Sequence, residues 1–468
     1  MTEHTLQMTA RFDRTLVRQG HTSVRYLLVE MTAPSSTELA TRELPPLNLG
    51  VVIDASGSMN AHDGGGNSGL DLSRLEAAQQ ASEGIAKNLD ARDTLSLVSF
   101  ADEALTHISA LSLDEAGKRE ARATIQTLST RGCTNLHDGW MEGAEQVALY
   151  QMRNPDCIQR LLVLTDGQAN EGVVDPHELA EVAANLRRSG ISTSAVGIGE
   201  GYSTEQIEPI TEHGGGMLHH TERPSDIIEV VLAELRDMRA TVIDDLEVEV
   251  EVVDDADDAT GSSASNGSSS MGGGGASGAE GGVGIEVVGL VTRDSRAVLG
   301  SLVGNATRRA VFRVHVPAGC DRPLRFRIEA NWRGAEGREN VQCQAELMPT
   351  HDDAVYTEAW NQEVCAEAAR IWQGDIIRQA LALNRVEDFR GARAFARTQK
   401  RYFSHYARRL DEGEEMLKQL ERALRRMARP MRERSRKEIG TAMLKQRKGV
   451  HDYRTSEAPK KWDEYLDE

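Results

Sequence analysis

The chain has 468 residues, more than one compact hydrophobic core usually holds, so two or three domains are expected. Apolar residues make up 39% of the sequence, enough for globular domains, although aromatic residues are sparse at 4%. The formal charge of −19 argues against a protein that binds nucleic acid over its whole surface. That charge is uneven, because residues 390–448 hold 19 Lys and Arg against 7 Asp and Glu.

Nothing in the sequence predicts a membrane segment or a secretion signal. The N-terminus has no apolar core of signal-peptide length, and nowhere do about 18 uncharged apolar residues run together. The cysteines are odd in number and include no CxxC pair: Cys133, Cys157, Cys320, Cys343 and Cys365. This is a poor framework for disulfides or zinc, so we expect a protein of the reducing cytoplasm with no membrane contact.

Residues 1–46 alternate in strand fashion, with a turn at residues 34–36, and are interpreted as the first strands of a β domain. Residues 47–238 instead alternate between apolar runs and helical segments. The apolar runs are residues 49–53, 95–100, 161–164 and 191–198. The helical segments between and after them include residues 74–89, 136–150, 177–187 and 225–238. Apolar strands separated by helices predict an α/β domain with a doubly wound, mostly parallel sheet that helices cover on both faces.

Strand-like alternation returns in residues 239–350, interrupted by a segment of Gly, Ser, Ala and Asp at about 254–283. That segment cannot bury enough apolar surface to order itself and is interpreted as a flexible loop. Strands are expected to resume at residues 285–291, 310–316 and 324–330. We predict that the early and late strands form one antiparallel β domain, into which the α/β domain is inserted.

The remainder of the chain is predicted to be helical from residue 351 to 430. Apolar residues follow one another at three- and four-residue steps, typical of a single buried stripe: Trp360, Val364, Ala368, Ile371, Trp372 and Ile376. Pro430 should end the last helix, because proline cannot donate the backbone hydrogen bond that a helix needs. Residues 431–468 are interpreted as a basic, loosely ordered tail.

Polar side chains follow two of the predicted strands at the point where each strand ends. Asp54 ends the first apolar run in LGVVIDASGSMN, and Ser56 and Ser58 occupy alternate positions in the turn after it. Thr134 lies in a loop before a helix, and Asp166 follows the run LLVLT. Ligands of doubly wound sheets bind beyond the carboxyl ends of the strands. Two carboxylates and three hydroxyls there predict a Mg²⁺ or Mn²⁺ site, with Ca²⁺ as an alternative.

Only two carboxylates would serve this cation, so the protein leaves it electrophilic with a coordination position to spare. A carboxylate from another protein can fill that position. The sequence therefore predicts a receptor for an Asp or Glu side chain of a partner protein.

The segments DASGS, GCTNLHDGW and LLVLTDG together resemble the metal-ion-dependent adhesion site of von Willebrand factor A domains, over about residues 47–238. The resemblance implies that the Ser56, Ser58 and Thr134 hydroxyls bind the metal, and that Asp54 and Asp166 do so directly or through water. It also implies rearrangement of the site on ligand binding in some members. The flanking regions resemble a bacterial intracellular member of the family. The sequence departs from the family pattern by a Gly-rich insertion at residues 61–69, beside the predicted metal site. This insertion could shape or gate the surface that a partner contacts, so the sequence does not define that surface.

Simpler interpretations exist for several of these residues. Asp54, Ser56 and Ser58 could form only a strand end with an Asx-turn and capping hydroxyls, or a metal site without a function. His219 and His220 lack further ligands at metal spacing and are interpreted as ordinary polar residues. Cys133 could be a reactive thiol, but it is interpreted as a small buried residue.

We expect a binding protein, acting as a scaffold or adaptor, and not an enzyme, because the strong polar constellation is already used by the metal. One alternative is an accessory subunit of an AAA+ ATPase complex, a role that the resemblance suggests, with the basic tail as a docking surface. A second is metal-assisted hydrolysis, with Asp102 or Asp138 as the nearby candidate bases. A third is a purely structural metal. For the basic tail, the first interpretation is a solvated helix face. Docking onto an acidic partner or onto this protein's own acidic surface is the second, and contact with nucleic acid is the last.

Overall fold

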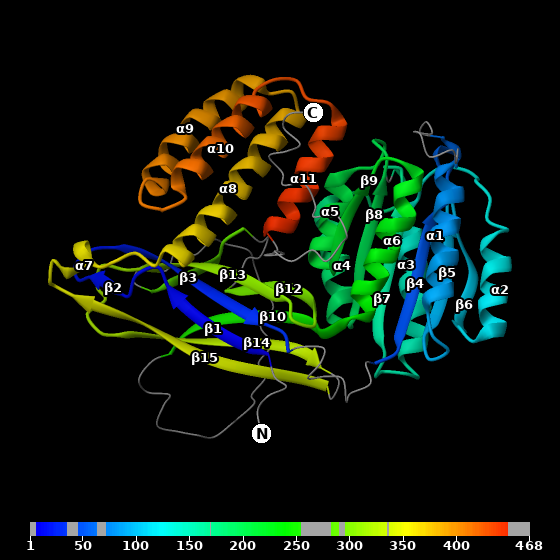
Figure 1. Ribbon diagram of the computed structural model, residues 1–468, viewed down its shortest axis with the longest axis horizontal. Coiled ribbons are helices and arrows are strands. Elements are labelled where there is room, and N and C mark those ends of the chain that lie inside the picture. The colour runs from blue at the N-terminus through cyan, green and yellow to red at the C-terminus, as the bar shows by residue number, and fades with distance from the viewer. Residues whose placement is uncertain are drawn as a thin grey trace.

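The computed structural model describes residues 6–34, 45–62, 72–168, 170–253, 282–289, 295–334 and 337–447. It contains an α/β domain, a β sandwich and a set of C-terminal helices (Figure 1). Nearly all of the predicted Gly/Ser loop at 254–283 and most of the insertion at 61–69 lie outside the described residues. Among the helices that are described, none combines the length and the apolar composition needed to cross a membrane.

The α/β domain is built on a six-stranded sheet with the order β6-β5-β4-β7-β8-β9. Its strands are β4 (Leu47–Asp54), β5 (Thr94–Phe100), β6 (Ala104–Ser112), β7 (Ile158–Thr165), β8 (Ile191–Ile198) and β9 (Gly215–Thr221). All neighbours pair in parallel except β5 and β6. The apolar runs of β4 and β7 are buried along their whole length, as expected for strands covered on both faces.

Helices cover both faces of this sheet and confirm the predicted doubly wound α/β architecture. They are α1 (Arg74–Asn88), α2 (Glu115–Ile125), α3 (Leu136–Gln151), α4 (Pro176–Arg188), α5 (Thr204–His213) and α6 (Pro224–Arg239), with a short 3₁₀ turn η1 (Gly57–Asn60) after β4. One core joins the sheet to Ile85 of α1 and Val231 of α6. A second core, on the other face, contains Trp140 of α3 and Leu179 of α4.

The β domain consists of two sheets that share one hydrophobic core. Their orders are β1-β3-β13-β11 and β12-β10-β14-β15-β2. The strands are β1 (Gln7–Phe12), β2 (Leu16–Arg18), β3 (Ser23–Thr32), β10 (Thr241–Val253), β11 (Gly284–Val287), β12 (Arg296–Val303), β13 (Thr307–Val316), β14 (Leu324–Gly334) and β15 (Gly337–Thr350). Strand β3 pairs antiparallel with β13, and β2 pairs in parallel with β15. The α/β domain is therefore inserted between strands of one β domain.

The C-terminal helices are α7 (Ala354–Thr357), α8 (Gln362–Arg385), α9 (Phe389–Ala407), α10 (Gly413–Met427) and α11 (Glu433–Arg447). Helix α8 is apolar on two faces. Val364 and Ile371 pack against the β domain, whereas Ile377 packs in a core with Phe403 of α9 and Leu420 of α10. Helix α8 thus attaches the helical region to the β sandwich.

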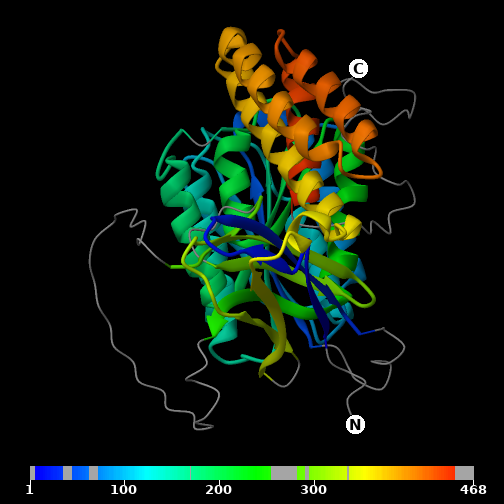
Figure 2. The same ribbon diagram turned by 90° about the vertical axis from the view of Figure 1, so that its left-hand side faces the viewer.

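The prediction of a loosely ordered tail from residue 431 onward is wrong for its first part, which forms α11. Ile439 and Met443 are buried in the core of the helical region. Lys437 is also buried, and Figures 1 and 2 show α11 lying against the α/β domain. The sequence of this basic segment has few apolar residues and no clear apolar stripe, so it does not predict a packed helix. The reason is that part of the surface by which α11 packs is polar. Residues 448–468 lie outside the described residues.

Candidate metal site

Two adjacent parallel strands bring the predicted site residues to one edge of the sheet. Strands β4 and β7 pair in a register that places Ile53 opposite Leu164. Asp54 is therefore at the end of one strand, and Asp166 follows the last residue of its neighbour. Strand order reverses around β4, which pairs with β5 on one side and β7 on the other. This is where ligands bind to open α/β sheets.

A chain of short polar contacts connects the two serines to Asp166. The Oγ atoms of Ser56 and Ser58 lie 3.0 Å apart. Ser58 Oγ donates to Oδ1 of Asp166 at 2.6 Å, and Nη1 of Arg74 donates to Oδ2 of the same carboxylate at 2.5 Å. Both oxygens of Asp166 are thus held, one by a hydroxyl and one by a cation.

Asp54 and Thr134 both lie close to Gly167. The carboxylate of Asp54 accepts hydrogen bonds from the backbone N of Ser56 at 2.8 Å and from Oγ1 of Thr165 at 2.6 Å. A Cβ atom on Gly167 would lie 3.0 Å from Oγ1 of Thr134 and 3.5 Å from Oδ2 of Asp54. The structure therefore brings all five predicted residues together.

The site is buried at its base and open at its rim. Asp54 and Asp166 are 0% and 1% exposed, whereas Ser58 lies on the surface. Burial raises the pKa of Asp54 to about 6, although hydrogen bonds from Thr165 and Ser56 oppose the shift. A bound cation would favour the ionised form of this carboxylate. Five oxygen donors at an open rim fit Mg²⁺ or Mn²⁺.

Arg74 is the site residue that sequence reasoning missed. It is the first residue of α1, which begins at a capping box formed by Ser73 and Glu76. The N-cap signal in the sequence predicts the start of the helix but not the direction of the arginine side chain. Its guanidinium places one positive charge beside Asp166, so a divalent cation bound at this site would share Asp166 with Arg74.

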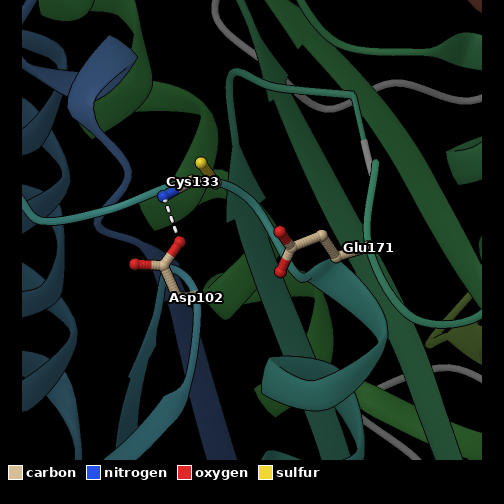
Figure 3. A group of neighbouring side chains, drawn as sticks. All are labelled: Asp102, Cys133 and Glu171. Carbon is tan, nitrogen blue, oxygen red and sulfur yellow. Dashed lines mark hydrogen bonds between the residues drawn. The ribbon is translucent and has the colours of Figure 1, made fainter.

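A second group of potential ligands lies at the surface near Thr134 (Figure 3). It consists of Asp102, Cys133 and Glu171, whose ligand atoms all lie within 4.8 Å of one another. The backbone N of Cys133 donates to Oδ1 of Asp102 at 2.7 Å. Cys133 is exposed, so its prediction as a buried residue is wrong. Hydrogen bonding to Asp102 and the charge of that carboxylate raise the pKa of the Cys133 thiol, which disfavours the thiolate that metals bind.

The remaining candidates have ordinary partners. His219 Nε2 lies 2.8 Å from the buried carboxylate of Glu234, and His220 Nδ1 lies 3.1 Å from the hydroxyl of Tyr202. Asp138, a candidate base, accepts a hydrogen bond from the backbone N of Ala104 at 3.0 Å. These contacts agree with the interpretation of the two histidines as ordinary polar residues.

Residues 48–231 match the family model of the von Willebrand factor type A domain. The chain contains a von Willebrand factor type A (VWA) domain. Among curated relatives, an uncharacterized protein of Escherichia coli K12, YfbK, is 29% identical over 216 residues, which are 45% of this chain and 34% of the relative. The uncharacterized protein sll0103 of Synechocystis is 26% identical over 220 residues, 46% of each chain. Inter-alpha-trypsin inhibitor heavy chain H3 of Rattus norvegicus is 26% identical over 39% of this chain and 20% of its own. The chain thus spans less than half the length of these relatives.

Two solved structures resemble nearly the whole chain. A von Willebrand factor type A protein from Catenulispora acidiphila superposes with a TM-score of 0.65 and 14% identity, over 97% of this chain and 99% of its own. The ArnB paralog VWA2 from Sulfolobus acidocaldarius superposes with a TM-score of 0.55 and 12% identity, over 95% and 97%. At these identities the likeness shows the fold alone. It extends beyond the VWA domain to the β domain and the helical region.

Proposed function

We propose that this protein is a metal-dependent protein-binding scaffold or adaptor that captures a partner's Asp or Glu carboxylate at its VWA domain. Mg²⁺ or Mn²⁺ would be held by Asp54, Ser56, Ser58, Thr134 and Asp166. The observation that carries the proposal is the convergence of these oxygen donors beyond the ends of β4 and β7, with Ser58 at the surface. VWA domains typically mediate protein–protein interaction or metal-dependent adhesion, which supports the same conclusion.

The charge of the site favours a carboxylate as the recognised group. When bound, a divalent cation offers a Lewis-acidic position to an external oxygen ligand. The two buried carboxylates and the guanidinium of Arg74 leave one net negative charge in the site. A divalent cation reverses that sign, so the loaded site attracts an anionic side chain and the unloaded site does not.

The first experiment is titration calorimetry of the full chain with Mg²⁺ and Mn²⁺. Wild type is compared with Asp54→Ala and with Asp156→Ala, which removes an exposed carboxylate from the turn before β7. We expect binding by wild type and Asp156→Ala and loss of binding in Asp54→Ala. Equal binding by all three proteins would reject the metal site.

Partner capture then tests recognition. Wild type with Mg²⁺, wild type with EDTA and Asp54→Ala with Mg²⁺ serve as baits in native lysate, and retained proteins are identified by mass spectrometry. Proteins retained only by the first bait support recognition through the cation. The same set with all three baits would contradict it.

A further inference from the structure

A short loop at residues 199–202, between β8 and α5, lies against the candidate metal site. Gly199 has a φ of +65°, and a Cβ atom there would lie 2.8 Å from Nη2 of Arg74. A Cβ atom on Gly201 would lie 2.5 Å from the backbone O of Asp166. A side chain at Gly201 would clash with the backbone of Asp166, and one at Gly199 would be strained by the positive φ, so the loop backbone lies directly against Asp166 and Arg74.

The same loop is held from its other side by α11. Nζ of Lys437 donates to the backbone O of Glu200 at 2.7 Å and to that of Tyr202 at 2.6 Å. The ammonium also lies 3.7 Å from the centroid of the Tyr202 ring. Lys437 is only 1% exposed, and burial lowers its pKa to about 8. A lysine is seldom buried so completely, because loss of hydration is costly unless backbone oxygens and a ring replace the water.

Other contacts anchor α11 on two sides. Arg434 forms an ion pair with Glu222, which follows β9 of the VWA domain. Arg436 donates to the side-chain oxygen of Asn384 in α8 at 2.9 Å, and Ile439 is buried among the C-terminal helices. Helix α11 therefore connects the helical region to the loop beside the metal site. Figure 1 shows α11 between α8 and α5.

We propose that Lys437 clamps the loop at residues 199–202 against the backbone of Asp166, so that docking of α11 and cation binding at the VWA site stabilise each other. This inference rests on the proposed function, because it concerns the same site. Release of α11 would leave the carbonyls of Glu200 and Tyr202 without their ammonium donor and would free the loop to move away from Asp166. By linkage, the cation must then favour the docked helix as strongly as the docked helix favours the cation.

The first test measures Mg²⁺ affinity by titration calorimetry in the full chain. Lys437→Met removes the ammonium but keeps much of the side-chain volume, and Lys418→Met, an exposed lysine of α10, is the matched control. We expect Mg²⁺ to bind Lys437→Met about five- to tenfold more weakly than wild type, the range typical of moderate coupling between sites. Lys418→Met should bind as wild type does. Circular dichroism and the melting temperature verify that each variant is folded.

The second test needs no change at Lys437, so it decides the question even if that variant does not fold. Amide hydrogen exchange is measured in wild type and in Asp54→Ala, each with and without Mg²⁺. We expect Mg²⁺ to slow exchange in α11 about five- to tenfold in wild type and to leave it unchanged in Asp54→Ala.

The outcomes separate the clamp from the metal site. Wild type that does not bind Mg²⁺ overturns both the proposed function and the clamp. The clamp alone is overturned if wild type binds Mg²⁺ and either of two results follows. One is a folded Lys437→Met that binds Mg²⁺ as tightly as wild type does. The other is amide exchange in α11 of wild type that Mg²⁺ leaves unchanged.

Discussion

Arg74 donates to Oδ2 of Asp166 at 2.5 Å, while Ser58 donates to Oδ1 of the same carboxylate. The VWA domain thus carries its own cation beside the candidate metal site. Arg74 comes from the start of α1, and Asp166 follows the end of β7. The positive charge of Arg74 offsets part of the negative charge of Asp166 that would otherwise attract a metal ion.

We predict that Arg74→Met binds Mg²⁺ more tightly than wild type. Removing a unit positive charge a few ångströms from a divalent cation relieves repulsion of about 1–2 kcal/mol after screening, or roughly tenfold in affinity. Titration calorimetry measures the change. Arg122→Met in α2, whose side chain is 69% exposed, is the control and should not change the affinity. Weaker binding by Arg74→Met would mean that the arginine chiefly orients Asp166 for the metal.

Ser58→Ala should weaken Mg²⁺ binding without unfolding the protein. Ser58 is exposed, so water can replace its hydroxyl as the donor to Oδ1 of Asp166. The variant removes one proposed oxygen ligand and one donor to Asp166, and we expect about a tenfold lower affinity with a melting temperature close to wild type. Ser112→Ala, an exposed serine at the end of β6, serves as the control. A matched loss of affinity in both variants would reject Ser58 as a ligand.

The ion pair between Arg160 of β7 and Asp244 of β10 should be important for stability. Nη2 of Arg160 donates to Oδ1 of Asp244 at 2.7 Å, both residues are buried, and the pair connects the VWA domain to the β domain. Asp244→Ala leaves a buried guanidinium without its carboxylate, which costs about 3–5 kcal/mol. Urea denaturation of the metal-free chain measures this loss. The double variant Arg160→Met/Asp244→Leu should recover most of the lost free energy of unfolding. No recovery would show that the hydrogen bonds of Ser301 to the two residues contribute more stability than the ion pair itself.

His220 should make the protein sensitive to acid. Burial, with the charges of Lys437 and Arg434, lowers the pKa of His220 to about 4. The native state therefore keeps this imidazole neutral while the unfolded chain takes up a proton below pH 6.5, so stability falls as pH falls from 6.5 towards 4. We expect His220 to account for about 2 kcal/mol of the loss between pH 7 and pH 4.5.

Urea denaturation at the two pH values tests this assignment. His220→Gln should lose less stability on acidification than wild type. His177→Gln, an exposed histidine of α4, should lose as much as wild type. Equal pH dependence in wild type and His220→Gln would place the acid sensitivity elsewhere.

Local patterns in the sequence predicted the α/β domain and the place of its site. Uninterrupted apolar runs mark strands that are buried on both faces, and parallel strands of that kind end at one edge of the sheet. Asp54 and Asp166 directly follow two such runs, so their proximity could be inferred without coordinates. The return of strand alternation after residue 238 likewise predicted the inserted arrangement.

Tertiary structure alone decided the contacts between distant segments. The pairing of β3 with β13 and the approach of Lys437 to the loop at residues 199–202 depend on packing across hundreds of residues, which no local periodicity encodes. The exposure of Cys133 and the direction of the Arg74 side chain depend in the same way on which neighbours surround each residue. The sequence by itself therefore determined which groups lie at the ends of the strands. Only the folded chain determined which charges and helices surround them, because those depend on how separate elements pack together.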